Sequence, residues 1–467
     1  MKPFEFNRHT LSRFKLDPTF SPMVLNHQAF LNQVRKTNDI RPVKIAITRS
    51  MGQVSVYETV VFGDSSHQET ANFTYLERLV KTLLWIKGGC KIHVLGYPAF
   101  SRYLKTLYHP EGLRAFDQRF MSEIYESSFD IVESSERDFP NMCEESKAIG
   151  RHLEGCRIGF DAGGSDRKVS ALIDGVAVFS EEVVWHPKIQ SHPSYHQEGI
   201  MDSIHRAASH LPRVDAIGVS TAGVVIDNRM MASSLFIQVT DPSLKDQTKS
   251  IYTDIKNAFD VPLEVANDGD VTALAGSMSL KKNRVLGIAM GTSEAAGYVD
   301  ANGNLLGWLN ELAFVPIDDA KEAMIDEWSL DRGCGVKYLS QDAVIKLAKM
   351  AHLPLDNQLT PAENLKVVQH LAEQGHSKAC DIFEMIGCYL AYAIAYYCMF
   401  YDIGVVLILG RVTSGRGGKL ILEAANEVLS SEFPDLFQTL TIQLPDEMSR
   451  RVGQSIAAAS LPSLRKI

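Results

Sequence analysis

The sequence predicts an α/β protein in which one type of domain is used twice, after a further α/β region at the N-terminus. Two segments share one pattern: an apolar strand, a glycine turn, a second strand, and then a turn at Asp-Gly or Asn-Gly. They begin at Arg157 and Val285, roughly one domain's length apart. The chain has 467 residues, which is too long for one hydrophobic core and enough for two or three domains.

The N-terminal region is expected to be a mixed α/β unit that ends near Gly150. Ser21 and Pro22 are typical of a helix start, and Gly88 with Gly89 of a helix end. The acidic stretch 111–145 is expected to be irregular. The run 43–62 faintly repeats the hairpin pattern, at most as a degenerate copy. The expected starting residues are Ser21 and Thr74 for helices and Val43, Val54 and Lys91 for strands.

Beyond Arg157 the pattern alternates between strands and helices, as in an α/β domain. The apolar stretch from Cys388 to Gly410 is interrupted by Asp402 and becomes β-branched, which indicates a buried helix followed by a buried strand and not a membrane span. The expected starting residues are Asp202 and Ser250 for helices and Val214 and Val261 for strands.

Composition narrows the class of protein. The hydrophobic fraction is 45%, the charged fraction 22% and the net charge -9, values that disfavour a general binder of nucleic acid or anionic membrane. The seven cysteines are scattered without a CxxC pair, which indicates reduced thiols in a cytoplasmic protein. The segment MKPFEFNRHTLSRFK shows no apolar core of a signal peptide.

The first hairpin carries the residue types that bind nucleotide phosphates. Asp161 ends a buried strand, and Gly163, Gly164 and Ser165 follow at once. Glycines let backbone N–H groups approach phosphate oxygens, the carboxylate can hold Mg²⁺ or its water, and Lys168 adds positive charge. An ordinary tight hairpin explains the same residues about as well when they are taken alone.

Three further motifs follow in the chain. Gly291, Thr292 and Ser293 could bind a second phosphate, although a plain turn explains them better when they are taken alone. Asn267 and Asp268 end the strand from Val261, where ligands of α/β sheets bind, and a carboxylate there can accept a proton from an attacking hydroxyl. The alternative is a helix cap. Gly410 ends another buried strand and suits an adenosine ledge or a loop. The order of all four motifs is more informative than any one.

With these motifs, residues from Arg157 onward resemble the ROK family of repressors and sugar kinases, within the hexokinase–actin–Hsp70 superfamily. IGFDAGGSDRK and IAMGTSEAAG resemble its two phosphate motifs, VANDGDVTALAG its catalytic segment, and VVLILGRVTSG its adenosine motif. The resemblance implies that Asp268 is the catalytic base and Asn267 a sugar ligand. It also implies two RNase H-like, actin-like ATPase domains with a cleft between them.

The sequence departs from the family pattern at sugar-contacting residues, at the zinc motif and in the second phosphate loop. NELAFVP stands in place of the family's G-E-x-G-H element, so that Glu311 is retained as a sugar ligand and Phe314 occupies the histidine position. Cys334 lacks the partner thiolates of the family's zinc motif, so no zinc site is expected. Ser234 takes the place of a sugar-contacting asparagine, and Glu294 lies in the second phosphate loop.

These observations favour a hexose kinase that uses ATP and Mg²⁺, in the cytoplasm, with no nucleic-acid or membrane partner. Two alternative functions stay open: a non-catalytic sugar- or nucleotide-binding relative, and a sugar-responsive repressor. The sequence does not identify the sugar or the oligomeric state, and a homodimer is one possibility. The expected domains are 1–150, an extension of unknown role; 151–275, completed by a C-terminal helix at 447–467; and 276–446.

Overall fold

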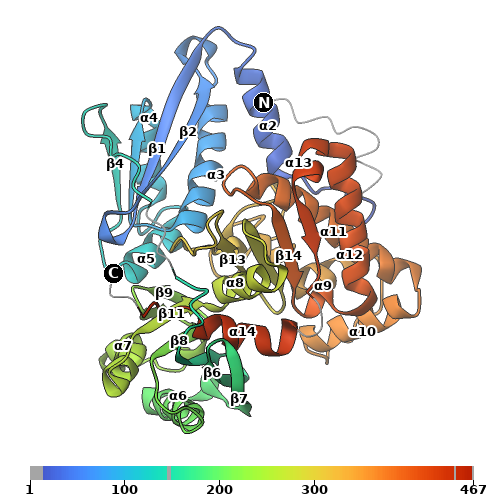
Figure 1. Ribbon diagram of the computed structural model, residues 1–467. Helices are drawn as coiled ribbons and strands as arrows, with labels where there is room; N and C mark the ends of the chain where they lie inside the picture. The colour runs from blue at the N-terminus through green and yellow to red at the C-terminus, as the bar shows by residue number, and fades with distance from the viewer. Residues whose placement is uncertain (1–13, 145–148, 446–448, 465–467) are drawn as a thin grey trace.

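The computed structural model describes residues 14–144, 149–445 and 449–464. It is a mixed α/β molecule with three principal sheets (Figure 1). The predicted fold class is confirmed: two sheets of the actin-like ATPase type follow an N-terminal α/β region. The domain boundaries remain a prediction.

The N-terminal sheet has the strand order β2-β1-β3-β4. Gly88 and Gly89 end the long helix α3 as expected, but α3 begins at Glu69, ahead of the expected Thr74. The elements are α2 (Met23–Val34), β1 (Ile40–Thr48), β2 (Val54–Phe62), α3 (Glu69–Lys87), β3 (Lys91–Leu95), α4 (Pro98–Leu107), α5 (Ala115–Ile124) and β4 (Asp130–Ser134).

Two sequence expectations for this region are wrong. The acidic stretch 111–145 contains helix α5 and strand β4. Its Asp117 is buried, because Lys81 and Trp85 of α3 bind its carboxylate, so an acidic residue here belongs to the core. The hairpin of β1 and β2 is also no copy of the later hairpins: β1 pairs antiparallel with β3, whereas β5 pairs parallel with β8 and β12 parallel with β14.

The second sheet has the order β11-β8-β5-β6-β7. Helices α6 and α7 begin earlier than expected, because His192 and Asp241 cap them and a proline occupies the first turn of each. The elements are β5 (Cys156–Ala162), β6 (Asp166–Ile173), β7 (Val176–Val184), α6 (Pro193–Ala208), β8 (Ala216–Thr221), α7 (Pro242–Phe259) and β11 (Leu263–Asn267), with a small hairpin of β9 (Val224–Ile226) and β10 (Arg229–Ala232).

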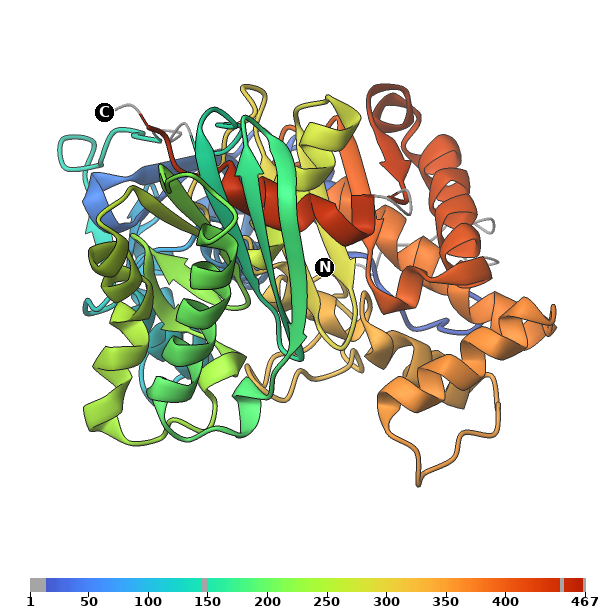
Figure 2. The same cartoon turned by 60° about the horizontal axis from the view of Figure 1, so that its bottom comes forward.

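The last helix, α14 (Ser449–Ala459), lies across this second sheet (Figure 2). It approaches so closely that a side chain at Gly159 or Gly218 would collide with its backbone. The buried guanidinium of Arg157 donates to the carbonyl oxygen of Pro462 at 2.7 Å, just beyond the helix end. The C-terminal segment therefore packs on the sheet that carries the first hairpin.

The third sheet has the order β13-β12-β14-β15 and is joined to the second by helix α8. The elements are α8 (Asp268–Leu280), β12 (Val285–Met290), β13 (Glu294–Val299), α9 (Gln341–Met350), α10 (Pro361–Glu373), α11 (Ser377–Tyr397), β14 (Val405–Leu409), α12 (Gly415–Glu432), α13 (Pro434–Thr439) and β15 (Thr441–Gln443). Of the described residues, only α11 is long and apolar enough to cross a membrane, and it is mostly buried, as in a core helix.

One continuous hydrophobic core joins the N-terminal region to the third sheet and its helices. Phe20 packs edge-on against Tyr389 of α11, with ring centroids 4.7 Å apart. Asp17 accepts a hydrogen bond from the Tyr389 hydroxyl at 2.6 Å and pairs with Lys346 of α9 at 2.5 Å. The N-terminal region thus packs against helices α9 and α11 through a shared core and is not a separate domain on a linker.

Candidate active site

The first hairpin places its exposed tip beside two lysines. Asp161 is buried at the end of β5, and its Oδ1 accepts from the Ser220 hydroxyl of β8 at 2.7 Å. Gly164 and Ser165 are exposed at the tip. Lys168 pairs with Asp166 at 3.2 Å, and Lys188 lies against Gly164. This arrangement of backbone N–H groups and cations suits phosphate oxygens.

The second hairpin and the Gly410 turn meet at the third sheet. Thr292 and Ser293 are exposed at the hairpin tip. Gly410 has a φ of 99°, and a side chain there would collide with the backbone of Met290, the residue before Gly291. Glycine is required here because L side chains rarely adopt this φ and because two backbones touch. The structure therefore brings the second phosphate motif and the adenosine motif together.

A cavity of about 630 Å³ connects the first hairpin to the Gly410 turn. Its lining includes Lys168 of β6, Gly410 and Arg411 of the turn, and Gln454 of α14. Thr272 and Gly276 of α8 also line it. We call it the nucleotide pocket, after the role that the sequence predicts for Lys168 and Gly410 in its lining. Its volume lies in the range of ligand pockets.

The first turn of α8 carries the motif that the sequence predicts to be catalytic. Asn267 caps the helix: its Oδ1 accepts from the Gly269 N–H at 2.7 Å, and its Nδ2 donates to the Gly223 carbonyl at 2.8 Å. Asp268 is the first residue of the helix. Asp270, which sequence reasoning did not select, accepts from the Asn310 side chain at 2.9 Å. Two carboxylates, separated by Gly269, therefore lie in the first turn of the helix.

A second cavity, of about 240 Å³, lies at this end of α8. Asn267, Asp270 and Glu311 line it, together with residues of the β9 turn and of the N-terminal region. We call it the acceptor pocket. Helix α8 thus has its first turn at the acceptor pocket and its body at the nucleotide pocket. Asp268 lines neither pocket itself, and it stands in the chain between Asn267 of the acceptor pocket and Thr272 of the nucleotide pocket.

The carboxyl groups of the site hold protons more tightly than usual. Burial raises the pKa of Asp161 to about 6 and, with the charge of Asp161, that of Asp268 to about 7. Burial raises the pKa of Asp270 to about 7. Burial and then the charges of Asp268 and Asp270 raise that of Glu311 to about 7. Strongly shifted groups in a cleft are typical of functional sites.

Glu311 is positioned by the N-terminal region. Its N–H donates to the Trp85 carbonyl in the last turn of α3 at 3.1 Å, and the Asn310 N–H donates to the Ile86 carbonyl at 3.0 Å. Phe314 packs its ring against Trp85, with centroids 4.2 Å apart. The last turn of α3 therefore fixes the backbone that carries Glu311.

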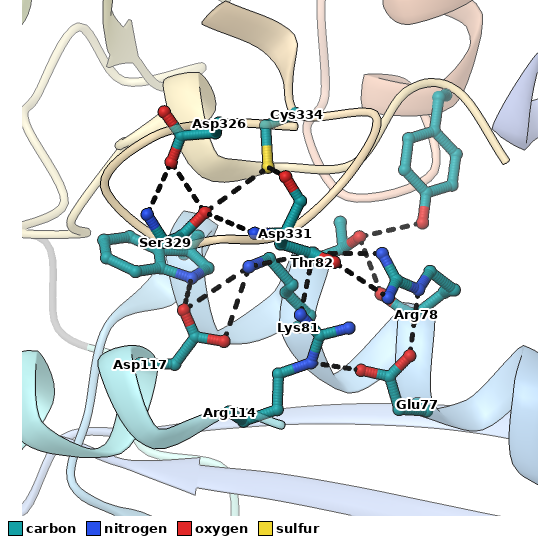
Figure 3. Close-up of polar contacts among 12 residues, drawn as sticks. Glu77, Arg78, Lys81, Thr82, Arg114, Asp117, Asp326, Ser329, Asp331 and Cys334 are labelled. Carbon is teal, nitrogen blue, oxygen red and sulfur yellow. Dashed lines mark hydrogen bonds and ion pairs between the residues drawn. The ribbon is translucent and has the colours of Figure 1, made fainter. Parts of the chain in front are cut away.

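A buried network of ion pairs connects the loop around Asp331 to helix α3 (Figure 3). Asp331 pairs with Arg78 and Lys81 of α3, both at 3.0 Å, and with Arg114 at 2.8 Å. Glu77 and Asp117 complete the charge balance. Cys334 lies within the same loop, 3.8 Å from the Ser329 hydroxyl, and burial raises the pKa of its thiol to about 12.

Of the site residues selected from the sequence, only Asn267, Glu311, Lys168 and Gly410 line one of the two pockets. Ser234 is exposed in a short turn and lines neither the acceptor nor the nucleotide pocket. The Glu294 side chain is buried and directed toward Gly335, not toward the exposed hairpin tip. Burial, and then the charge of Glu311, raises its pKa to about 8, so at neutral pH it places no full charge behind the loop.

Sequence reasoning also missed part of the acceptor pocket. Arg49, Tyr125 and Trp308 line it, and none lies in a recognisable motif. Asp270 could have been found, because an acidic side chain two residues after Asp268 lies on the same first turn of a helix. Lys188 could not, since only the fold brings it to the hairpin.

The residues present fit Mg²⁺ bound mainly by phosphates. Among the described residues, no group of three or more His, Cys, Asp or Glu side chains could hold a metal ion. Mg²⁺ commonly takes one or two carboxylates and completes its shell with phosphate oxygens and waters. Asp161, buried beside the first hairpin with one oxygen bound to Ser220, is the carboxylate suited to this role.

Comparison with known proteins gives the family. The ROK family model matches residues 157–442. No curated protein matches the chain. The chain is similar to a ROK hexokinase from Thermus thermophilus (18% identity, TM-score 0.49, covering 65% of this chain and 97% of that one). It is also similar to a ROK glucokinase from Streptomyces griseus in complex with glucose and AMPPNP (19%, 0.48, 65% and 98%).

A third structure, of a ROK transcriptional regulator homologous to the E. coli MLC protein, has 16% identity and a TM-score of 0.50, covering 66% of this chain and 79% of that one. At this identity the similarity concerns the fold alone. The family model, in contrast, covers more than half of the chain and includes both hairpins, the first turn of α8 and the Gly410 turn. The chain therefore belongs to the ROK family.

Proposed function

We propose that this protein is an ATP-dependent kinase that transfers the γ-phosphate to a hydroxyl of a hexose-type sugar. One observation carries the proposal: helix α8 borders both pockets, and Asp268 is its first residue, between Asn267 and Asp270 of the acceptor pocket and ahead of Thr272 of the nucleotide pocket. A phosphoryl donor in the nucleotide pocket and a sugar in the acceptor pocket would then meet at this carboxylate.

In this mechanism Asp268 accepts the proton of the attacking hydroxyl. Its raised pKa supports the role, because a general base works best when its pKa is near the working pH. Asn267 and Glu311 orient the sugar, and Asp270 adds a further acceptor for a sugar hydroxyl. Ser234, which lies away from the pocket, would reach a sugar only if the cleft closed.

The nucleotide side uses the backbone and the cations. Gly163, Gly164 and Ser165 present the first hairpin to the phosphates, with Lys168 and Lys188 beside it. Gly291, Thr292 and Ser293 present the second hairpin, and Gly410 leaves room for the adenosine. Mg²⁺ held near Asp161 would neutralise phosphate charge. Positioning and electrostatics of this kind supply most of the rate in phosphoryl transfer.

The alternatives have less support. A ROK repressor would carry three helices and a small hairpin at its N-terminus, whereas residues 14–144 form a four-stranded sheet with helices. The non-catalytic alternative depended on Glu294 and Phe314. Glu294 is buried away from the hairpin tip and Phe314 packs on Trp85, so neither occupies the site.

The test is a coupled assay of ADP release with ATP, Mg²⁺ and a panel of hexoses, amino sugars and sugar acids. We expect release that depends on one class of sugar. Sugar-independent release, or none with any member, would contradict the kinase. Binding of a sugar without turnover would favour the non-catalytic relative.

A further inference from the structure

The acceptor pocket is lined by two chemically different sets of side chains. The ROK part supplies carboxylates, which accept hydrogen bonds from sugar hydroxyls. The N-terminal region supplies the donors Arg49 and Tyr125, and Trp308 of the ROK part adds a third donor. Arg49 is the only basic residue among the described residues that line this pocket. The carboxylate lining residues are Asp227, Glu264, Asp270 and Glu311.

The donors have spare hydrogen-bonding capacity. Arg49 Nη2, the Tyr125 hydroxyl and Trp308 Nε1 are all buried without a hydrogen-bond partner among the residues that the structure describes. Buried donors are nearly always paired in folded proteins, so three unpaired donors around one cavity call for an explanation. A ligand with several acceptor oxygens at this end of the pocket would supply the missing partners.

Arg49 is held in place for such a ligand. Its side chain is 6% exposed, and its Nη1 donates to the Ser55 hydroxyl at 2.7 Å and to the Lys87 carbonyl at 3.4 Å. Within the described part of the chain its one ion pair is with Glu144, at a long 3.8 Å. The guanidinium is therefore anchored through one nitrogen while the other is left for a ligand. Arginine in this arrangement suits carboxylate and phosphate groups.

Both donor residues of the N-terminal region are tied to the backbone of Glu311. The Tyr125 hydroxyl lies against Gly88, and Arg49 binds the Lys87 carbonyl, both at the end of α3. The Glu311 N–H binds the Trp85 carbonyl in the same helix turn. A ligand that contacts Glu311 through hydroxyls is thus presented to these donors in a fixed geometry.

We propose that the acceptor sugar carries an anionic oxygen group, a carboxylate or a phosphate, which Arg49, Tyr125 and Trp308 bind. The inference rests on the proposed function in one respect, namely that this pocket holds the sugar. It gives the N-terminal region a role in substrate selection. The neutral part of the sugar faces the carboxylates, and its acidic substituent faces the N-terminal region.

The test is calorimetric binding to the full chain, without nucleotide, of glucose, glucuronate, glucose 6-phosphate and N-acetylglucosamine. A charge-assisted contact predicts that one acidic sugar binds about 10- to 100-fold more tightly than glucose. Which of the two binds more tightly identifies the carboxylate or the phosphate as the group. Equal or tighter binding of glucose or N-acetylglucosamine would overturn the inference, as would no binding of either acidic sugar.

Two variants assign the contact. Tyr125→Phe removes only an unpartnered hydroxyl, so it should fold normally, and we expect it to weaken acidic-sugar binding about tenfold. Arg49→Gln should weaken it further, because it removes the guanidinium charge. Arg102→Gln, an exposed arginine of the same region, is the control and should bind like the unmodified protein. Unchanged affinity for the acidic sugar in both pocket variants would refute the proposal.

Failure of this inference can be told apart from failure of the kinase proposal. Tight binding of an acidic sugar without phosphoryl transfer would overturn only the kinase activity. Efficient phosphorylation of neutral hexoses, equal in the unmodified protein and both pocket variants, would overturn only the selection of an acidic group.

Discussion

Asp268 is the residue on which the proposed chemistry depends. Asp268→Asn keeps the shape and most hydrogen bonds of the side chain but cannot accept a proton. General-base assistance contributes about 10²–10⁴-fold, so we expect kcat to fall by at least about 10²-fold with little change in the affinities for sugar and ATP. Steady-state kinetics with the sugar found in the panel checks this. Near-normal turnover would mean that Asp268 only begins the helix, because asparagine serves that role about as well.

The raised pKa of Asp268 makes a prediction for pH dependence. Burial and the charge of Asp161 raise this pKa to about 7, so the carboxylate is increasingly protonated as pH falls below 7. A protonated Asp268 cannot act as a base. We therefore expect kcat/KM to fall about tenfold for each pH unit below 7. Because Asp268 interacts with Asp161, the pKa read from this profile describes the two carboxyl groups together. A flat profile from pH 5.5 to 8 would contradict this assignment, and the residual activity of Asp268→Asn should lack the inflection.

At the scale of elements, helix α3 joins the N-terminal region to the active-site segment. Burial alone would raise the pKa of Asp331, but Lys81, Arg78 and Arg114 hold it well below its usual range. Removing one partner of a buried ion pair leaves the others uncompensated, at a cost of about 3–5 kcal/mol. Asp331→Asn should therefore lower the free energy of unfolding by that amount in denaturant titrations.

An exposed pair in the same region is the matched control. Glu133 pairs with Arg102 at 3.7 Å on the surface, and Glu133→Gln should change stability by less than about 1 kcal/mol. The loop that contains Cys334 is held by the ion pairs of Asp331 with Arg78, Lys81 and Arg114. We therefore expect that zinc chelators do not change the thermal midpoint of the unmodified protein. Similar costs for the two variants, or a large loss of stability on chelation, would contradict this role of the network.

The elements that the sequence predicted well are those with local signals. The hairpins at Asp161 and Gly291 follow from glycine turns between apolar strands, and the strand and turn at Gly410 from the same pattern. Helix α5 was missed because Asp117 looks like a surface residue until Lys81 and Trp85, distant in sequence, are brought to it. Local patterns cannot report a charge that is compensated by tertiary contacts.

The candidate site divides in the same way. Asn267, Asp268 and Glu311 were selected from motifs, and the structure brings them to one end of α8. Arg49 and Tyr125 lie in stretches with no motif, and they reach the pocket only because the N-terminal region packs on the segment 305–311. Their role is a property of how two regions meet, which no short stretch of sequence encodes.

At the scale of the whole molecule, the N-terminal region contacts the two parts of the ROK portion, one built on the second sheet and one built on the third sheet. Toward the third sheet it shares one hydrophobic core, to which Trp85 and Phe30 contribute. Toward the second sheet, Glu126 pairs at the surface with Arg229 and with Lys249, at 2.5 and 2.8 Å. The contact with the third sheet is large and apolar, whereas the contact with the second sheet is made by exposed ion pairs. The N-terminal region is therefore held mainly by the third sheet and its helices.

This difference predicts what happens when the region is removed. A chain that begins at Ile149 would expose the core surface that α2 and α3 cover and would leave Asp331 buried without its three cations. Loss of a shared core generally exceeds the 5–15 kcal/mol by which a protein is stable. We therefore expect the shortened chain to aggregate or to lack a cooperative thermal transition. Glu126→Gln in the full chain, which removes only the exposed contact, should keep the normal thermal midpoint within a few degrees. A shortened chain that melts cooperatively would show instead that residues 149–467 form an independent unit.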